Sequence, residues 1–492
     1  MKSTRIRKCM VPENEGEAMI LINIDRQNTK DHIYQQIYRE IKNTILENKL
    51  SPSEKLPSKR RLAKELGVSI NSVTNAYEQL LAEGYIYTME RKGYYVEDIK
   101  QFMSPHELYV RPDFPEDLKE KTVDHQGGWI SLSHISTDIS MFPFNEWIKC
   151  EKMAIKYHAE ELAKVSHPQG PYLVRQTIAR LIAVSRGVIC EPEQVIIGPG
   201  TQPLLWQIMN MLPLGITTAI ENPGYARLYQ QLKDTNHHVI PIPLDDKGID
   251  MNRVEELNPS LLFITPSHQF PTGIIMPISK RLEILNWTVN HKHTYIVEDD
   301  YDSEFKYGTD NIPSLQSLDR HQRVIYTGTF SKTIMSGLRI SYFVLPPDLL
   351  REYRRKYSNW IQGSNTLSLY TLHYFIESGE YTKHIKRMNN SYEQKRELLV
   401  KELKNRFKED IYISDIRAGL HFLAEFKTNH TYEDVSEKAI QKKLEIYPLT
   451  RFMLDGQLVE TGKIVLVIGF ASIASPEIPE AVQRLYEIFY ED

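Results

Sequence analysis

The spacing of apolar residues changes along this chain of 492 residues, and the change marks two parts. In the first part, isoleucines recur at every fourth position from Ile33 to Ile45, which places them on one face of a helix. From Trp129 onward, short apolar runs alternate with segments of helix length, at residues 195–197, 261–264, 295–297, 324–326 and 340–345. Apolar strands joined by crossovers predict an α/β fold with a mostly parallel sheet covered on both faces.

The segment from residue 56 to residue 96 predicts two short helices and a hairpin. Ser58 and Ser69 are natural N-caps, and Gly67 supplies a C-terminal stop between the two helices. Two helices joined by such a turn form a helix-turn-helix, whose second helix enters the major groove of DNA. Apolar residues at 85–87 and 94–96 then predict a hairpin, the wing of a winged helix.

Charge supports DNA binding only locally. The whole chain has a net charge of −4, and residues 30–98 hold 11 Lys or Arg and 10 Asp or Glu, so neither carries a general basic field. Cations gather instead at the start of the first short helix and at the hairpin tip, where they suit phosphates, and polar residues on the second helix suit base edges. The candidates are Lys59, Arg60, Arg61, Arg91 and Lys92 for phosphates, and Asn71 and Thr74 for base edges. A generic helical cap with solvated charges is the competing interpretation.

The run LPSKRRLA…LGVS.NSV…AY..LLAEGYIY….KGYYV resembles the winged helix of the GntR family of bacterial transcription factors, over nearly all of residues 30–98. The resemblance implies that double-stranded operator DNA is a partner. It matches Arg60 to a helix arginine of the family and places four residues at or beside contact positions: Ser69, Asn71, Thr74 and Lys92. Ile70 is a departure, because the family commonly has arginine there, and we expect one phosphate contact to be missing.

The remaining boundaries follow from composition. Residues 1–18 are polar and aperiodic and are expected to form a disordered extension, with Met19 as an alternative start. Residues 19–98 are the predicted winged helix-turn-helix domain, residues 99–128 a polar linker with three prolines, and residues 129–492 the second domain. A linker of this length allows two domains to swap between partners.

Cysteine usage and hydropathy indicate a cytoplasmic protein. The three cysteines are widely separated, match no metal spacing and suggest no disulfide framework, which fits a reducing compartment. No apolar run approaches the roughly 18 residues of a membrane span, and the N-terminus is charged where a signal peptide needs an apolar core. We therefore expect neither a metal site nor a membrane partner.

The second domain is organised around residues 327–346, TGTFSKTIMSGLRISYFVLP. Lys332 follows the strand at 324–326 among small residues, and Arg339 follows seven residues later. A lysine held at a strand end can form a Schiff base, and an arginine can bind a phosphate in a bidentate way. Pyridoxal 5′-phosphate (PLP) needs this pairing. A surface lysine is the competing interpretation for this pair alone.

Three further motifs follow predicted strands. Thr201 and Gln202 open a helix after a Gly-Pro-Gly turn, where backbone N–H groups favour an anion. Tyr225 is suited to stack on a flat ring or to pack in the core. Asp299 and Tyr301 end another strand, where a carboxylate can keep a pyridine nitrogen protonated and a tyrosine can hydrogen-bond a phenolic oxygen.

Taken together in this order, the motifs resemble the fold type I aminotransferases over about residues 129–490. The resemblance implies a smaller C-terminal α+β subdomain and a bound PLP. Carried over by position, Lys332 is the Schiff-base lysine, Asp299 the pyridine partner, Tyr301 the phenolic-oxygen donor and Tyr225 the stacking ring, with Thr201, Gln202, Thr329 and Arg339 at the phosphate.

Two departures concern the ligand. The enzymes usually have asparagine before Pro-Thr-Gly, where this chain has Phe270, and His268 is expected to substitute as a polar contact. Near the C-terminus, Val467 stands where many enzymes have the arginine that binds the substrate carboxylate. Arg227 and Arg451 are the candidates to replace it.

A winged helix followed by an aminotransferase-like domain is the architecture of the MocR subfamily of GntR regulators, and the resemblance is closest to its members that respond to γ-aminobutyrate (GABA). It implies a head-to-tail, domain-swapped homodimer that senses GABA or a related small amine through an external aldimine. It also implies activation of amine-utilisation genes, with repression of its own gene as a further expectation. A working aminotransferase with an accessory DNA-binding domain is the alternative, and a large domain that only dimerises is a third hypothesis.

Overall fold

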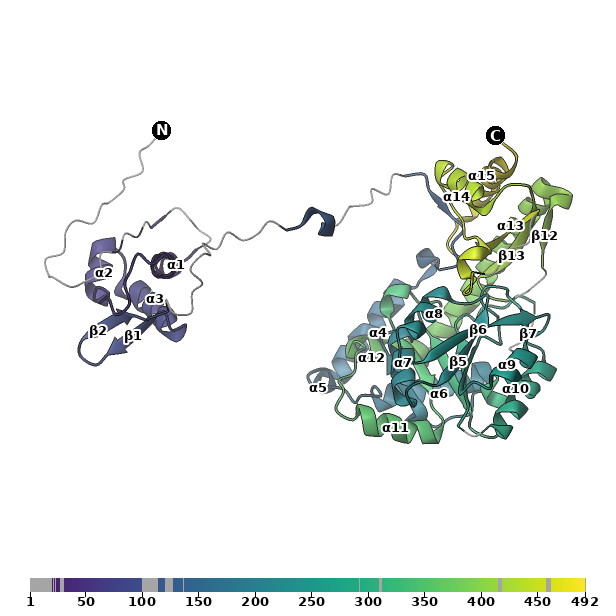
Figure 1. Ribbon diagram of the computed structural model, residues 1–492, viewed down its shortest axis with the longest axis horizontal. Coiled ribbons are helices and arrows are strands. Elements are labelled where there is room, and N and C mark those ends of the chain that lie inside the picture. The colour runs from purple at the N-terminus through teal and green to yellow at the C-terminus, as the bar shows by residue number, and fades with distance from the viewer. Residues whose placement is uncertain are drawn as a thin grey trace. The chain divides into compact units, whose positions relative to one another are not determined.

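The computed structural model describes residues 20, 22, 24–26, 31–99, 114–119, 127–135, 137–291, 293–308, 312–414, 418–456 and 462–491. The chain divides into two compact units, Met1–Val123 and Asp124–Asp492, and each is described by itself (Figure 1). The predicted extension 1–18, the alternative start at Met19 and most of the predicted linker 99–128 lie outside the described residues. The predicted domain boundaries therefore stay predictions.

The first unit is built as the hydrophobic pattern requires. Its elements are α1 (Ile33–Leu46), α2 (Lys59–Leu66), α3 (Ile70–Ala82), β1 (Ile86–Met89) and β2 (Gly93–Val96). The Ser58 side chain accepts a hydrogen bond from the N–H of Arg61, and Gly67 ends α2 with φ 64° in the left-handed region. The isoleucines of α1 pack with the buried face of α3 in one core. The predicted helix-turn-helix and hairpin are confirmed.

The second unit contains an eight-stranded sheet in the order β4-β11-β10-β9-β8-β5-β6-β7. The strands are β4 (Val195–Gly198), β5 (Thr217–Asn222), β6 (His238–Asp245), β7 (Gly248–Ile249), β8 (Leu261–Ile264), β9 (Tyr295–Asp300), β10 (Val324–Thr329) and β11 (Ser341–Val344). The pairs from β10 through β9, β8 and β5 to β6 are parallel, whereas β11 is antiparallel to both of its neighbours and β7 is antiparallel to β6. The predicted, mostly parallel sheet is confirmed.

Helices cover both faces of this sheet, as Figure 1 shows. Along β4, Val195 and Ile197 pack toward α4, α6 and α12, while Ile196 packs on the other face toward α7, α8 and α11. The helices are α4 (Phe144–Tyr157), α5 (Ala159–Leu162), α6 (Tyr172–Arg186), α7 (Thr201–Met211), α8 (Ala226–Lys233), α9 (Met251–Leu257), α10 (Ile278–Asn290), α11 (Pro347–Tyr357) and α12 (Thr366–Glu377).

The C-terminal part forms a smaller α+β subdomain. Its antiparallel sheet consists of β12 (Ile411–Ile413), β13 (His421–Lys427) and β15 (Lys463–Gly469), with α13 (Glu380–Phe407), α14 (Tyr432–Gln441) and α15 (Ile478–Tyr490). The short strand β3 (Ile130–Ser131) pairs in parallel with β14 (Leu444–Glu445), so the start of this unit packs into the subdomain. Within the described residues, no helix combines the length and the apolar character that a membrane crossing requires.

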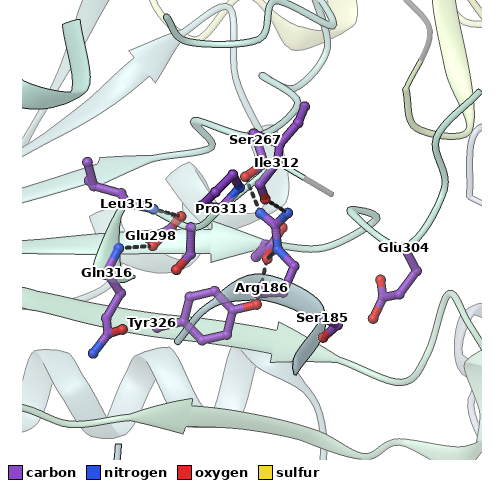
Figure 2. Close-up of polar contacts among 12 residues, drawn as sticks. Ser185, Arg186, Ser267, Glu298, Glu304, Ile312, Pro313, Leu315, Gln316 and Tyr326 are labelled. Atoms are coloured by element: carbon purple, nitrogen blue, oxygen red, sulfur yellow. Dashed lines mark hydrogen bonds and ion pairs between the residues drawn. The ribbon is translucent and has the colours of Figure 1, made fainter. Parts of the chain in front are cut away.

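A buried ionic network fixes the end of β9 beneath the sheet edge (Figure 2). Arg186, the last residue of α6, donates to Asp300 Oδ2 at 2.6 Å, to the Ser267 hydroxyl at 2.5 Å and to the carbonyl oxygen of Ile312. Tyr326 also donates to Asp300 at 2.5 Å. The side chains of Arg186 and Asp300 are only 5% and 1% exposed, so neither charge is solvated.

Replacing Arg186 should destabilise the folded protein strongly. Arg186→Met leaves the Asp300 carboxylate buried without its cation, which costs about 3–5 kcal/mol of unfolding free energy. Arg180→Met is the matched control, because Arg180 lies on the same helix and forms an exposed pair with Glu377, and such a pair contributes about 0–1 kcal/mol. Urea unfolding of the full-length protein measures both, and equal losses would contradict the assigned role of burial.

Candidate functional site

A cavity of about 340 Å³ lies where the parallel strands of the second unit end. Its walls come from the loops after β5, β8, β9 and β10, from the start of α7 and α8, and from the small subdomain. Ten of the residues predicted from the sequence line it: Thr201, Gln202, Tyr225, Arg227, Asp299, Tyr301, Thr329, Lys332, Arg339 and Arg451. Segments up to 250 residues apart in the sequence therefore meet at one edge of the sheet.

The Lys332 amine is held inside the cavity. It lies in the turn after β10, and its Nζ donates to the backbone carbonyl oxygens of His134 at 3.0 Å and Ile135 at 2.8 Å. Burial lowers the pKa of Lys332 to about 8, against the opposing attraction of Asp302. At pH 7 about a tenth of the amine is therefore neutral, and so nucleophilic.

An anion cradle lies beside the lysine, at the N-terminus of α7. Gly200, with φ 111°, comes so close to the Arg339 guanidinium that an added Cβ would lie 2.0 Å from Nη2. The hydroxyls of Thr329 and Ser341 lie 2.8 Å apart next to it. The buried Ser331 hydroxyl has no hydrogen-bond partner among the described residues. Backbone N–H groups, hydroxyls and a guanidinium converging on one point suit a phosphate.

The opposite wall carries a carboxylate and a phenol. Asp299 accepts a hydrogen bond of 2.8 Å from the Thr327 hydroxyl, and burial raises the pKa of Asp299 to about 7, with Asp300 and Asp302 adding to the effect. Tyr301 contacts His268 with its hydroxyl, and burial raises the pKa of Tyr301 well above its ordinary value. Asp299 can thus accept a hydrogen bond from a ring N–H, and Tyr301 stays a neutral donor.

Aromatic rings form the rest of the wall. Tyr225 precedes α8, is 37% exposed, and packs edge-on against Phe270 with ring centroids 5.9 Å apart. Phe270 in turn packs against Phe452 at 5.1 Å. Val467 is fully buried in the same cluster, together with Tyr447. Val467, at the strand position where many aminotransferases have an arginine, is therefore part of an aromatic core and is not among the residues that line the cavity.

Arg227 and Arg451 come from segments that hydrogen bonds tie together. The Gly224 N–H donates to the carbonyl oxygen of Phe452 at 3.0 Å, and the Leu454 N–H donates to Asn222 Oδ1 at 2.9 Å. Arg451 also lies over the Tyr447 ring, 5.1 Å from its centroid. These bonds join the loop after β5 to the small subdomain, so the two arginines contribute to the same cavity.

His134 is a lining residue that sequence reasoning missed. Burial, together with the charges of Lys332, Arg451 and Arg227, lowers the pKa of His134 to about 3. The imidazole is therefore neutral and lies among three cations. The other missed lining residues include Ser331, Asp302, His421, Tyr447 and Phe452. The acidic cluster after β9 was a signal for Asp302, whereas His134 and His421 stand in no motif.

His268 is placed differently from the prediction. It does not line the cavity but lies behind Tyr301, 2% exposed, with Nδ1 3.0 Å from Asp302 Oδ2. Tyr301, whose hydroxyl contacts His268, lines the cavity at this point, and the expected polar contact of His268 with a ligand stays a prediction.

The first unit presents a second candidate site, a nucleic-acid interface on α2, α3 and the hairpin. Arg60, Asn71, Arg91 and Lys92 are exposed, and Thr74 is half-buried. Three candidates also have partners in the unit: the Ser69 hydroxyl accepts from the N–H of Ser72 at 3.1 Å, Arg61 pairs with Glu65 at 2.8 Å, and Lys59 lies over the Tyr94 ring. Ile70, the first residue of α3, is 49% exposed.

Comparison with known proteins gives two family matches. The family described as "Aminotransferase class I and II" matches residues 134–484, and the family "Bacterial regulatory proteins, gntR family" matches residues 33–96. The chain is 36% identical to the HTH-type transcriptional regulator YdeL of Bacillus subtilis, over 92% of this chain and 96% of that protein. It is 30% identical to the probable rhizopine catabolism regulatory protein MocR of Rhizobium meliloti, over 93% and 94%.

Solved structures show the fold of the second unit. The α-aminoadipate aminotransferase LysN of Thermus thermophilus matches 74% of this chain and 92% of its own, with 23% identity and a TM-score of 0.65. A multiple-substrate aminotransferase of Thermococcus profundus matches 77% and 97%, with 24% identity and a TM-score of 0.67. The second unit therefore has the fold of type I aminotransferases.

The reactivity of Lys332 should depend on pH in a distinctive way. Because its pKa is lowered to about 8, labelling by a small amine-reactive reagent should rise about tenfold from pH 6 to pH 7 and level off above about pH 9. Asp302→Asn should move the midpoint lower, since the Asp302 carboxylate favours the charged amine. Peptide mass spectrometry measures the labelling, and a midpoint near 10 would contradict the assigned desolvation.

Proposed function

Because this chain belongs to the MocR-type transcriptional regulators, which join a gntR-family helix-turn-helix to an aminotransferase class I and II domain, we propose that it regulates transcription in response to a small amine. The single observation that carries the proposal is the cavity around Lys332. It combines a nucleophilic amine, an anion cradle and two further arginines in a chain that also has a DNA-binding unit.

The cavity fits PLP. The close approach of Gly200 to Arg339 and the unpartnered hydroxyl of Ser331 suit the phosphate group. The Asp299 carboxyl, bonded to the Thr327 hydroxyl, suits a ring N–H, and the exposed ring of Tyr225 suits a flat aromatic partner. When bound, PLP supplies an aldehyde that condenses reversibly with amines. Lys332 would hold it, Thr201, Gln202, Thr329 and Arg339 would bind its phosphate, and Asp299, Tyr301 and Tyr225 would contact its ring.

The effector we propose is GABA or a related small amine that bears a carboxylate. Its amine would compete with Lys332, whose lowered pKa makes it a displaceable partner. Its carboxylate would bind Arg227 and Arg451, since Val467 leaves no arginine on the strand that usually supplies one. Neutral His134 lies among these cations and can donate a hydrogen bond to the same carboxylate without adding charge.

Regulation requires only that the effector favour one of two conformations of the protein. We propose a head-to-tail, domain-swapped homodimer in the cytoplasm, with the predicted domains 19–98 and 129–492 joined by the linker 99–128. Displacement of Lys332 would change the contacts of residues 134–135, which bind its amine directly. The expected outcome is activation of amine-utilisation genes and repression of the protein's own gene.

A working aminotransferase with an accessory DNA-binding domain is the second candidate, and the fit of the cavity to PLP favours it equally. The relatives include a 2-aminoadipate transaminase of Thermus thermophilus, 24% identical over 70% of this chain. Steady-state transamination at about 1 to 1000 turnovers per second would favour this candidate. A visible absorbance band that GABA changes without such turnover would favour the regulator.

Four substitutions should separate cofactor binding from effector binding. Lys332→Ala should abolish the response of a reporter gene to GABA. Arg339→Gln should weaken PLP binding about 10- to 100-fold, because it removes a charge-assisted bidentate contact. Arg227→Gln and Arg451→Gln should leave PLP affinity unchanged and raise the GABA concentration for half response about 10-fold or more.

Absorbance titration with PLP and with GABA measures these effects. Arg351→Gln is the matched control, because this exposed arginine pairs only locally with Asp348 on α11, and it should change neither titration. Reversed phenotypes for Arg339 and the pair Arg227 and Arg451 would contradict the division between the two sites.

A further substitution tests the DNA-binding face. Ile70→Arg restores the charge that the GntR pattern has at the start of α3 and should add about one phosphate contact, which steepens the salt dependence by about one counterion. Leu81→Arg is the control, since it adds the same charge to an exposed site at the other end of α3. Affinity for a duplex selected by the wild-type protein is measured at several salt concentrations, and equal slopes for the two variants would contradict the orientation of α3.

A further inference from the structure

His268 and Asp302 form a buried pair directly behind the cavity wall. Their side chains are 2% and 1% exposed, and Nδ1 of His268 lies 3.0 Å from Asp302 Oδ2 and 3.2 Å from Oδ1. A carboxylate only accepts hydrogen bonds, so Nδ1 carries the hydrogen. The other ring nitrogen, Nε2, has no hydrogen-bond partner among the described residues. Asp302 therefore keeps a hydrogen on Nδ1 of His268.

This pair determines the hydrogen bonds of Tyr301. The Tyr301 hydroxyl lies 3.0 Å from His268 Nδ1 and 3.1 Å from the backbone carbonyl oxygen of His268. The one hydrogen on Nδ1 lies between Asp302 and the Tyr301 oxygen, so Tyr301 accepts only a share of a bifurcated bond. The Tyr301 hydroxyl itself donates to the His268 carbonyl oxygen and can turn toward an acceptor in the cavity. A phenol that accepts a hydrogen bond is a stronger donor toward a third group.

The small subdomain closes over the pair. An added Cβ on Gly419, whose φ is 72°, would lie 1.9 Å from His268 Cε1 and 2.7 Å from Asp302 Oδ2. The Leu420 N–H donates to Asp302 Oδ2 at 3.3 Å. The residues next to β13 are thus in direct contact with the pair.

The ionisable groups around the His268 ring come from α6, from β13 and from the segment after β9. They are Tyr301 and Asp302 after β9, His421 on β13 with ring centroids 4.8 Å apart, and Arg186 and Lys306, which line a small space of about 10 Å³ with His268. His268, Asp302 and His421 have possible metal-ligand atoms within 4.8 Å of one another. The hydrogen bond of His268 to Asp302 and that of His421 Nε2 to the Pro271 carbonyl oxygen, at 3.1 Å, already use these groups.

We propose that His268 is a positioning residue that, held by Asp302, makes Tyr301 the hydrogen-bond donor to the phenolic oxygen of bound PLP. The His268–Asp302 pair would thus act through Tyr301 in place of the asparagine that many aminotransferases have at the position of Phe270. The inference rests on the proposed binding of PLP and adds a residue that does not itself reach the cavity. Loss of His268 weakens donation by Tyr301, so the phenolic oxygen is less stabilised in its ionised form.

The test is the pH midpoint of the visible absorbance of the PLP-loaded, full-length protein. His268→Phe keeps a buried ring and removes the N–H, and we expect the midpoint to rise by about one unit, a tenfold change in the protonation equilibrium. His268→Asn keeps a donor near the position of Nδ1, so its midpoint should lie close to the wild-type value. His237→Phe is the control: His237 is a buried histidine bonded to the Met209 carbonyl oxygen, outside the cavity, and its loss should not move the midpoint.

A second series of variants tests whether His268 acts through the Tyr301 hydroxyl. In a Tyr301→Phe background, His268→Phe should add no further shift, because the two residues act through one hydroxyl. If His268→Phe does not fold, His268→Gln, whose donor lies toward the position of Nε2, carries the same expectation of a raised midpoint.

Several outcomes would overturn the inference. Wild-type midpoints in folded His268→Phe or His268→Gln would make His268 a packing residue, as would equal shifts in the asparagine and phenylalanine variants. An additive shift in the Tyr301→Phe background would show that His268 acts by another route. A wild-type protein without a visible band would remove the proposed cofactor and this inference together, whereas a normal wild-type band with unshifted variants removes only the role of His268.

Discussion

The second unit depends on the burial of one acidic stretch, residues 298–304, which begins at the end of β9. Strand alternation sorts its side chains, with Glu298 and Asp300 on one side and Asp299 and Tyr301 on the other, toward the cavity. On the buried side, Glu298 accepts from the N–H groups of Leu315 and Gln316 at 2.7 and 2.9 Å (Figure 2), and Asp300 is neutralised by the Arg186 guanidinium. On the cavity side, the Asp299 carboxyl accepts from the neutral Thr327 hydroxyl, and burial raises the pKa of Asp299 to about 7, with Asp300 and Asp302 adding to the effect. Buried charges are tolerated only when they are paired, as Asp300 is with Arg186. The Asp299 carboxyl has a hydrogen bond from the Thr327 hydroxyl instead, and its raised pKa favours the neutral form.

Much of this arrangement could be predicted from local sequence, because strand ends in a parallel sheet meet at one edge. Lys332, Asp299 and Arg339 were found that way. Residues that reach the cavity through long-range pairing gave no such signal: His134 is placed by β3, which pairs with β14 more than 300 residues later. β6 was not predicted either, because Pro241 and Pro243 interrupt its apolar pattern. His268 was predicted at the cavity from its place in a motif, but spacing cannot reveal that Tyr301 lies in front of it.

In the DNA-binding unit, several side chains that could contact DNA also have partners within the fold. Ser69 and Ser58 satisfy backbone N–H groups at the helix starts, and Arg61 and Lys59 have intrachain partners. Their hydroxyls and charges are therefore not fully available to phosphates, and the near-neutral charge of residues 30–98 offers no general attraction to compensate. Asn71 and Arg91 are exposed, so in the proposed complex with DNA we expect such positions to carry more of the recognition. Sequence could identify the caps and the clusters, but not which cations the fold itself uses.

The distribution of charge around the cavity limits the ligand further. Asp299 and Asp302 line the cavity together with Arg227, Arg339, Arg451 and Lys332, and the basicity of Lys332 is reduced by burial. A simple cationic amine is attracted by the carboxylates but repelled by the arginines, and a simple anion meets the opposite conflict. The ligand that we propose, with an amine at one end and a carboxylate at the other, offers an opposite charge to both kinds of group. Burial and the nearby cations keep the pKa of His134 low and the imidazole neutral, so it adds a hydrogen-bonding group without adding charge. For the proposed ligands, we expect discrimination to depend on the spacing between their two charged ends.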